Sequence, residues 1–285
     1  MKHVLSLLLP LCLAGQAALA MHRPDDRQAI LLVVQYAFEG VNFMDLDKVG
    51  AAYHPAARLA YVDLDDGTLQ VLSAGQFVRA LSDEGRKQMQ RSLEVQRIDI
   101  YGDAALVKTC INHAKATRRM TDYLVLLRIE GEWRIVSRTS CTAYARFGDE
   151  APSEFLALQQ EEAIAQVLHR YHRSRRQRQR DELLALLHPQ VQLAYVHPRQ
   201  GSYQALSCDG YLEELDQIPA VLWGGRARID WIDCCGNTAV ARVTTRYPRL
   251  HASVVTYVSL IETAGRWYIH HSAAHRDEAA LRVLP

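Results

Sequence analysis

The nine residues HPAARLAYV at 54–62 return almost unchanged as HPQVQLAYV at 188–196, an offset of 134 positions from residue 54 to residue 188. The same offset joins matching residues along much of the chain, including Leu59 with Leu193, Gly102 with Gly236, and Trp133 with Trp267. Solenoid repeats have periods of roughly 20 to 50 residues, and this period is far longer. We therefore expect each copy to be a complete domain with its own core.

One segment departs from this register. The tripeptide RID at 97–99 recurs at 228–230, an offset of 131, and three extra residues in the segment WIDCC would restore the offset of 134. This alignment places Asp99 opposite Asp230. A change in loop length is tolerated where the chain turns, and a Gly follows in both copies.

The first twenty residues have the features of a secretory signal. A basic start at Lys2 leads into an apolar run from Val4 to Ala14, and small residues precede a cleavage point after Ala20. The apolar run is too short to span a bilayer, which takes about 20 residues. We expect residues 1–20 to be a signal peptide and the mature protein to be soluble, without a membrane span, and secreted or periplasmic.

The composition narrows the functional classes further. The chain has 33 basic and 32 acidic residues, so no general electrostatic attraction to nucleic acid is expected. The basic stretch HRYHRSRRQRQRDE at 169–182 is interpreted as a solvated helix end. Five cysteines follow Ala20, and their pairing stays open. Adjacent Cys234 and Cys235 should point to opposite faces of a strand.

Each copy shows helical patterns followed by strand patterns. In the first copy, apolar spacing predicts helices at 27–40, 45–53 and 74–81, and β-branched and aromatic runs predict strands at 93–101, 104–116, 121–129 and 133–142. The order predicts an α+β fold, with a curved antiparallel sheet wrapped on N-terminal helices. We expect a first domain at 21–147, a linker at 148–158 around the segment RFGDEAPSEF, and a second domain at 159–285.

The quoted segments, together with IDIYGDAALVK, TDYLVLLRIEGEWRIVSR, GNTAVARV and TYVSLIETAGRWYI, resemble the nuclear transport factor 2-like (SnoaL-like) superfamily and its putative lumazine-binding branch. The resemblance implies two tandem cone-shaped domains, each with an interior that can hold a small molecule. Single-domain relatives often dimerise through their sheets, so it also implies that the two domains pack as an internal pseudo-dimer. Members of the superfamily include enzymes and binding proteins, so fold alone does not assign function.

Alternation along the strands predicts which side chains of the first copy face the interior. His113 follows Ala105, Val107, Thr109 and Ile111 on one face, and Leu59, Tyr61 and Asp63 share a face on an earlier strand. The catalytic hypothesis is that His113, with Asp63 or Asp99, moves a proton on a small substrate held under Tyr36 and Tyr61. The alternative is that His113 lies near the rim, solvated or hydrogen-bonded.

The same rule predicts ligand-binding residues in the second copy. Tyr247 corresponds to His113, and Tyr195 and His197 correspond to Tyr61 and Asp63. His172 lies on the first helix of that copy and is a further candidate. Asp122 is a candidate in the first copy alone, because Thr121-Asp122-Tyr123 becomes Val255-Thr256-Tyr257 in the second.

These observations favour an exported protein that binds a small apolar or aromatic ligand. The alternatives are a dehydratase, isomerase or cyclase that uses His113 and a carboxylate, and an interaction protein with both interiors filled. No cofactor and no metal site are predicted, since the histidines lack a defined spacing and an obvious acidic ligand.

Overall fold

The computed structural model describes residues 25–63, 67–83, 91–113, 118–144, 154–197, 200–217, 225–248 and 251–275. The predicted signal peptide therefore lies outside the described residues. Both copies of the repeat fold into the predicted class, α+β, with three helices and a six-stranded sheet described in each. The first domain here means the described residues 25–144, and the second domain the described residues 154–275.

The first domain begins with its helices, as the apolar spacing predicts. Its elements are α1 (Asp26–Phe43), α2 (Leu46–Ala52), β1 (Tyr53–Val62), β2 (Leu69–Ser73), α3 (Ala74–Asp83), β3 (Arg91–Tyr101), β4 (Ala104–His113), β5 (Arg118–Ile129) and β6 (Glu132–Tyr144). Asp45 caps α2 by accepting a hydrogen bond from the backbone N–H of Lys48 at 3.1 Å. The strands follow the sheet order β2-β1-β6-β5-β4-β3.

The second domain repeats this order element by element. It contains α4 (Glu154–Gln177), α5 (Arg180–Leu186), β7 (Leu187–Val196), β8 (Tyr203–Leu206), α6 (Cys208–Gln217), β9 (Arg226–Cys235), β10 (Thr238–Tyr247), β11 (Ala252–Thr263) and β12 (Arg266–His275). Its sheet order, β8-β7-β12-β11-β10-β9, matches that of the first domain. Helix α4 begins at Glu154, within the segment that the sequence assigns to a linker.

The prediction of an antiparallel sheet is wrong for one strand pair in each domain. Strand β1 runs parallel to β6, and β7 runs parallel to β12, while the other pairs are antiparallel. The parallel pair arises because α3 and the four strands β2 to β5 separate β1 from β6 along the chain. The long route returns β6 beside β1 in the same direction.

The strand pairing keeps the offset of 134 throughout, so the predicted three-residue shift at WIDCC is wrong. Asp99 pairs with Leu106, and Asp233 pairs with Val240, which lies 134 positions after Leu106. The structural equivalent of Asp99 is therefore Asp233 and not Asp230. Asp230 lies at an irregularity of β9, between Ile229 and Trp231, where the pairing with β10 shifts by one residue.

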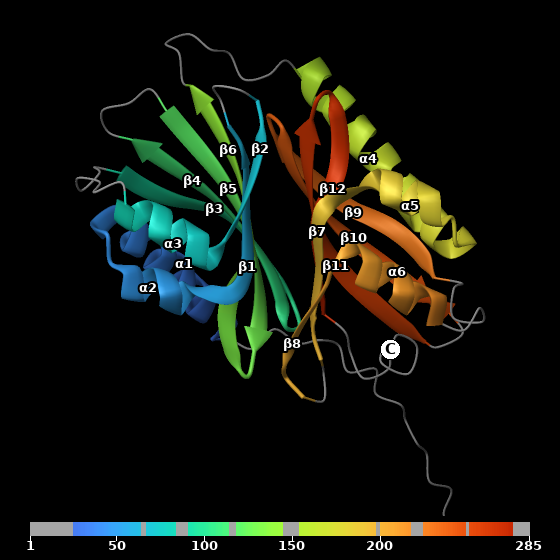
Figure 1. The fold of residues 1–285 in the computed structure, drawn as a ribbon, viewed down its shortest axis with the longest axis horizontal. Helices are drawn as coiled ribbons and strands as arrows, with labels where there is room; N and C mark the ends of the chain where they lie inside the picture. Colours follow the sequence, from blue (N-terminus) through green and yellow to red (C-terminus); the bar gives the residue numbers. More distant parts are fainter. Residues whose placement is uncertain are drawn as a thin grey trace, which may run out of the picture.

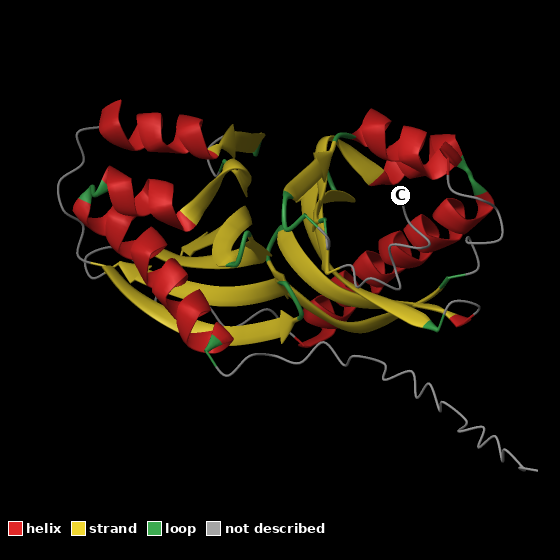
Figure 2. Ribbon diagram, turned by 90° about the horizontal axis from the view of Figure 1, so that it is seen from below, coloured by secondary structure: helices red, strands yellow, loops and turns green. Residues whose placement is uncertain are grey.

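Each sheet packs its concave face against its own helices and its convex face against the other sheet (Figures 1 and 2). In the first domain, Ile30, Val34 and Val49 from the helices meet Val107 and Leu126 from the sheet. A separate apolar cluster joins the sheets, and it contains Ala104, Leu106, Tyr123, Val125, Leu127 and Val136 with Ala194, Val196, Val240, Tyr257 and Ala273.

Polar contacts surround this contact between the sheets. Asp99 accepts hydrogen bonds from the Arg242 guanidinium at 2.9 Å and from the Tyr257 hydroxyl. Asp233 accepts from the Lys108 ammonium at 2.7 Å and from the Tyr123 hydroxyl at 2.6 Å. Hydrogen bonds to charged groups contribute about 1.5–3 kcal/mol, so these contacts add to the apolar burial.

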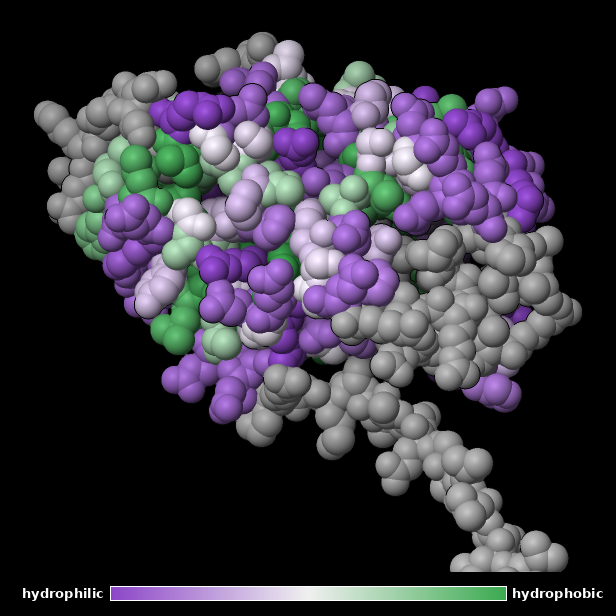
Figure 3. All heavy atoms as spheres, turned by 60° about the horizontal axis from the view of Figure 1, so that its bottom comes forward, coloured by the Kyte–Doolittle hydropathy of each residue, from purple (hydrophilic) through white to green (hydrophobic). Residues whose placement is uncertain are grey.

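The outer surface is polar by comparison. On the face in Figure 3, hydrophilic residues predominate and hydrophobic residues are scattered between them. Within the part of the chain that the structure describes, no helix combines the length and the apolar character needed to cross a membrane.

Candidate functional site

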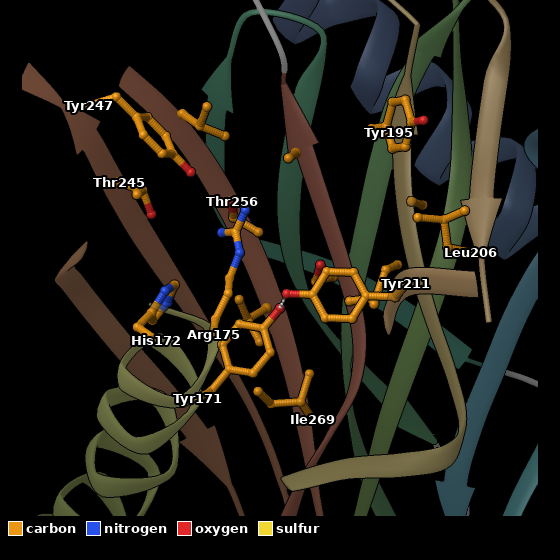
Figure 4. A pocket seen from close by; sticks show the side chains of 16 residues that line it. Tyr171, His172, Arg175, Tyr195, Leu206, Tyr211, Thr245, Tyr247, Thr256 and Ile269 are labelled. Carbon is orange, nitrogen blue, oxygen red and sulfur yellow. Dashed lines mark hydrogen bonds between the residues drawn. The ribbon is translucent and has the colours of Figure 1, made fainter. Parts of the chain in front are cut away.

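The interior of the second domain contains a cavity between α4, α6 and the concave face of the sheet (Figure 4). Its volume, measured as the space open to the centre of a water-sized sphere, is about 70 Å³. One water needs roughly 10–15 Å³ on this measure, so the space accommodates several waters or part of a small organic molecule. We call it the second cavity, and its lining includes Tyr171, His172, Arg175, Tyr195, Tyr211, Thr245, Tyr247, Thr256, Ser272 and Ala274.

Two tyrosines meet at the floor of the second cavity. The hydroxyls of Tyr171 on α4 and Tyr211 on α6 lie 2.6 Å apart and share a hydrogen bond. Their rings are stacked with an interplanar angle of 22°. Burial raises the pKa of Tyr171 well above its ordinary value, so its hydroxyl stays neutral and can donate or accept a hydrogen bond.

Arg175 extends from α4 into the second cavity, one helical turn after Tyr171 (Figure 4). Its guanidinium lies near Tyr247, which is 5% exposed on β10. A guanidinium keeps its charge in proteins, so the second cavity contains a permanent cation. Among the described residues, no carboxylate forms an ion pair with Arg175.

His172 adds a second unusual polar group to this cavity. Its Nε2 is buried and has no hydrogen-bond partner among the described residues. Burial, together with a smaller contribution from the positive charge of Arg175, lowers the pKa of His172 to about 3. The imidazole is therefore neutral at physiological pH, with a nitrogen that can bind a ligand.

The first domain has a smaller cavity at the equivalent place. Its volume on the same measure is about 30 Å³, and we call it the first cavity. A salt bridge of 3.1 Å between Arg138 and the 3% exposed Asp122 lies at its polar wall. The Ser140 hydroxyl donates to the other Asp122 oxygen at 2.6 Å. The charge of Arg138 is therefore paired within the protein, and a second arginine, Arg91, also lines this cavity.

The duplication shows how the two cavities came to differ. Residues that lie 134 positions after Asp122 and Arg138 are Thr256 and Ser272, which both line the second cavity. Strand register confirms the first equivalence, because Asp122 pairs with Thr109 and Thr256 pairs with Val243. The second domain thus lacks the internal ion pair, and its cation comes from α4 instead.

Proteins of a family described as "Putative lumazine-binding" match this sequence twice, at residues 25–139 and at residues 159–273. The chain belongs to this family. Each match corresponds to one of the two domains, which confirms the tandem arrangement predicted from the repeat. Among curated proteins, none matches the sequence significantly.

Solved structures of NTF2-like proteins resemble single domains of this family member. One, a protein of unknown function from Shewanella baltica OS155, has 25% identity over 43% of this chain and 98% of its own, with a TM-score of 0.40. Another of unknown function, from Silicibacter pomeroyi DSS-3, has 20% identity over 43% of this chain and 100% of its own, with a TM-score of 0.39. A third, from Methylobacillus flagellatus KT, has 18% identity over 44% and 97%, with a TM-score of 0.39.

Three of the predicted ligand-binding residues meet in the second cavity of this family member. Tyr247, Tyr195 and His172 all line it. The alternation rule placed Tyr247 and Tyr195 on the inner face, and they are 5% and 7% exposed. His197 does not join them, because it lies in the β7–β8 turn, where its Nδ1 accepts a hydrogen bond from the backbone N–H of Gln200 at 3.3 Å.

Of the two carboxylates predicted to act with His113, neither lines the first cavity. Asp99 lies on the convex face, bound by the second domain, so its pairing with His113 is wrong. A bulge between Val95 and Arg97 reverses the alternation of β3 and turns Ile98 and Ile100 inward in its place. Asp63 lies at the β1–β2 turn. The backbone of His113 pairs with Arg91, and its side chain lies outside the described residues.

The prediction that Tyr36 and Tyr61 cover a substrate in the first domain is also wrong. Tyr36 is 44% exposed on α1, where the Lys48 ammonium lies 5.9 Å from its ring centroid. Tyr61 is 38% exposed, and neither residue lines the first cavity. Asp122 does line it, in the ion pair with Arg138.

Sequence reasoning missed Tyr171, Arg175 and Tyr211. Tyr171 and Arg175 stand four residues apart, so they share a helix face, but the surrounding basic residues suggested solvent exposure. The neighbouring Arg173 and Arg176 are exposed, as expected, and Arg175 turns inward. Within the described ranges, no group of three or more His, Cys, Asp or Glu side chains is placed to hold a metal ion.

Proposed function

We propose that this chain is an exported small-molecule-binding protein and that its ligand binds in the second cavity. The observation that carries the proposal is the difference between the two cavities. The first is smaller and contains its own ion pair, whereas the second is larger and contains a cation and a neutral imidazole with unused hydrogen-bonding capacity. Ligand sites typically combine apolar walls with a few converging polar groups.

Export is part of the proposal, and it rests on the sequence of residues 1–20. The basic start, the apolar run and the small residues before position 20 support a cleaved signal. The mature protein would then act in the periplasm or outside the cell.

The proposal also includes an internal pseudo-dimer as the scaffold. The contacts between the sheets are reciprocal. In one direction, Asp233 of the second domain binds Lys108 and Tyr123 of the first. In the other, Asp99 of the first domain binds Arg242 and Tyr257 of the second. Each residue of one set lies 134 positions from its counterpart in the other. Such exchange of equivalent contacts is the property of a two-fold interface.

Binding is favoured over catalysis because neither carboxylate predicted for the acid–base pair lines the first cavity. Asp99 is held at the contact between the sheets, and Asp63 lies in a turn. In the second domain, the neutral His172 has no carboxylate partner among the described residues to orient it for proton transfer. Its nitrogen is suited to hydrogen-bond a bound molecule.

The duplication offers a matched test. Thr245 lines the second cavity, and Ile111, 134 positions earlier, lines the first. Native mass spectrometry of the purified protein would show a bound small molecule, and titration calorimetry would measure binding of lumazine as a probe. Thr245→Phe should remove the bound molecule or weaken probe binding at least tenfold, and Ile111→Phe should leave both unchanged.

The stability of each variant is checked by thermal unfolding. The proposal fails if wild-type protein carries no ligand and binds neither lumazine nor small aromatic probes. It also fails if Ile111→Phe, and not Thr245→Phe, abolishes binding.

A further inference from the structure

The electrostatics of the second cavity define the class of its ligand. Three tyrosine side chains, those of Tyr247, Tyr211 and Tyr171, lie close enough to act on the Arg175 charge. The Glu214 carboxylate lies 3.5 Å from the Tyr195 hydroxyl. Tyrosine side chains are therefore the main groups near the Arg175 cation within the described part of the chain.

The first domain shows what neutralises a cation in this fold. There Asp122 pairs with Arg138, and the positions equivalent to them in the second domain carry the uncharged Thr256 and Ser272. Val41, which lines the first cavity, lies 134 positions before Arg175. The second domain has therefore gained an inward cation and lacks the carboxylate that would accompany it.

Burying a charge without a counter-charge is unfavourable, and a bound anion would remove that penalty. Because a guanidinium binds carboxylates and phosphates through two parallel hydrogen bonds, it is well suited to this role. We infer that the ligand of the second cavity carries a carboxylate or phosphate group that binds Arg175. This inference rests on the proposed function and specifies the chemistry of the same site.

The remaining lining defines the other part of the ligand. Leu193, Val254, Val258 and Ile269 provide apolar walls, and Tyr195 and Tyr211 provide aromatic surface. The imidazole of His172 and the hydroxyls of Thr245 and Thr256 offer hydrogen bonds near the cation. The ligand is therefore a small organic anion with a compact apolar or aromatic body.

Three probes with the same ring test this assignment by calorimetry on the intact protein. Benzoate and phenyl phosphate carry the two anionic groups, and benzamide is the neutral analogue of benzoate. In wild-type protein, at least one anion should bind ten times or more tightly than benzamide. The better of the two identifies the preferred group.

Substitution of the cation provides the second part of the test. Arg175→Gln should reduce the anion preference to less than twofold, and Arg175→Lys should retain part of it. Arg176→Gln removes an exposed arginine from the adjacent position and should leave the preference unchanged. Thermal unfolding confirms that each variant is folded.

The outcomes separate this inference from the proposed function. If benzamide binds as tightly as the anions and Thr245→Phe removes all three, the cavity binds ligands but the anion assignment is wrong. Retention of the preference in Arg175→Gln also overturns the assignment. If no probe binds and no ligand co-purifies, both the assignment and the proposed function fail.

A separate observation concerns two cysteines from different domains. Cys141 is 6% exposed near the end of β6, and its Sγ lies 2.9 Å from the position that a Cβ on Gly236 would occupy. Gly236 directly follows Cys235, so the Cys141 thiol lies beside the Cys235 segment, close enough for the two thiols to influence each other. Cys235 packs on the apolar cluster between the sheets, and Cys234 packs on the core of the second domain, so the predicted opposite orientation of the two is confirmed.

We propose that Cys141 and Cys235 form a disulfide between the domains by exchange with a disulfide oxidant such as oxidised glutathione. The Cys235 thiolate attacks one oxidant sulfur, which forms a mixed disulfide and releases one glutathione thiolate. The Cys141 thiolate then attacks the Cys235 sulfur and displaces the second glutathione. Two protein thiols are oxidised and one external disulfide is reduced. The neighbouring Cys141 thiol lowers the pKa of Cys235, which supports its role as the attacking thiolate.

Peptide mapping after treatment of the folded protein with oxidised glutathione tests this pairing. The expected product links the peptides that contain Cys141 and Cys235. Cys235→Ser should abolish the link, and Cys234→Ser, the adjacent control, should retain it. Free thiols at both positions after oxidation, or a link from Cys141 to Cys234, would overturn the proposal.

Discussion

Asp99 in the first domain and Asp233 in the second occupy equivalent strand positions, and each is bound by a cation and a tyrosine of the other domain. Their side chains are only 15% and 20% exposed, so solvent screens these contacts weakly. The duplication has therefore placed two copies of one polar contact inside a single chain. This symmetry leads to a quantitative expectation.

Asp99→Asn and Asp233→Asn should each lower the free energy of unfolding by about 1.5–3 kcal/mol, and by similar amounts, because each removes one charged acceptor. Urea unfolding measures both losses. Asp216→Asn is the control, since Asp216 pairs with Arg180 on the exposed surface at 3.3 Å. Its effect should stay within about 0.5 kcal/mol. A loss confined to one of the two interface variants would contradict the symmetry.

The tyrosine pair in the second cavity should be energetically coupled. Tyr211→Phe removes the hydroxyl that lies 2.6 Å from the buried hydroxyl of Tyr171. A double-mutant cycle with Tyr171→Phe should give a coupling of about 0.5–1.5 kcal/mol, the usual net value of a hydrogen bond. Additive effects of the two substitutions would show that the hydroxyls do not interact.

Buried histidines should make the protein sensitive to acid. Burial lowers the pKa of His270 to about 3 and that of His271 well below its ordinary value. In the unfolded chain both titrate near 6.5, so the unfolded state binds more protons below that pH. Their contribution to stability is complete above about pH 6.5 and is lost as the pH falls toward 3.

His271→Leu tests the acid sensitivity. It should reduce the slope of unfolding free energy against pH by up to about 1.4 kcal/mol per pH unit between pH 6 and pH 4. His169→Leu changes an exposed histidine and is the control. An unchanged slope in His271→Leu, measured by urea unfolding at each pH, would refute the assignment.

A buried ion pair connects α1 to the sheet of the first domain. Arg128 donates to Asp26 at 2.6 Å, and the Trp133 indole donates to the other oxygen at 3.3 Å. Arg128 also pairs with Asp103 at 3.1 Å, so Asp26→Asn removes one of its two carboxylate partners, and we expect a loss of about 1.5–3 kcal/mol in thermal or urea unfolding. Gln160, at the equivalent position of the second domain, has no such role, and Gln160→Ala should cost much less. Equal losses in the two variants would contradict this account.

The repeat predicted the fold well because it reports on backbone pattern. Its offset gives two domains, and alternation along β7 and β10 gives the inward orientation of Tyr195 and Tyr247. The same rule failed at Asp99, since a bulge three residues earlier reverses the faces of the strand and leaves no clear mark in the sequence.

The candidate site was less predictable because it depends on tertiary packing. Tyr61 and Tyr195 are equivalent in sequence, yet one is 38% exposed and the other 7%. Arg175 stands in a strongly basic segment, and only the packing of α4 on the sheet shows that it enters the second cavity. Comparing the copies position by position would have drawn attention to it, since Asp122 and Arg138 are both lost in the second domain.

A crystal structure of the protein grown with benzoate tests the central claim most directly. The account predicts electron density for one benzoate in the second cavity, with its carboxylate within hydrogen-bonding distance of the Arg175 guanidinium. The first cavity should hold no benzoate. Density for benzoate in the first cavity alone, or only on the outer surface, would contradict the account.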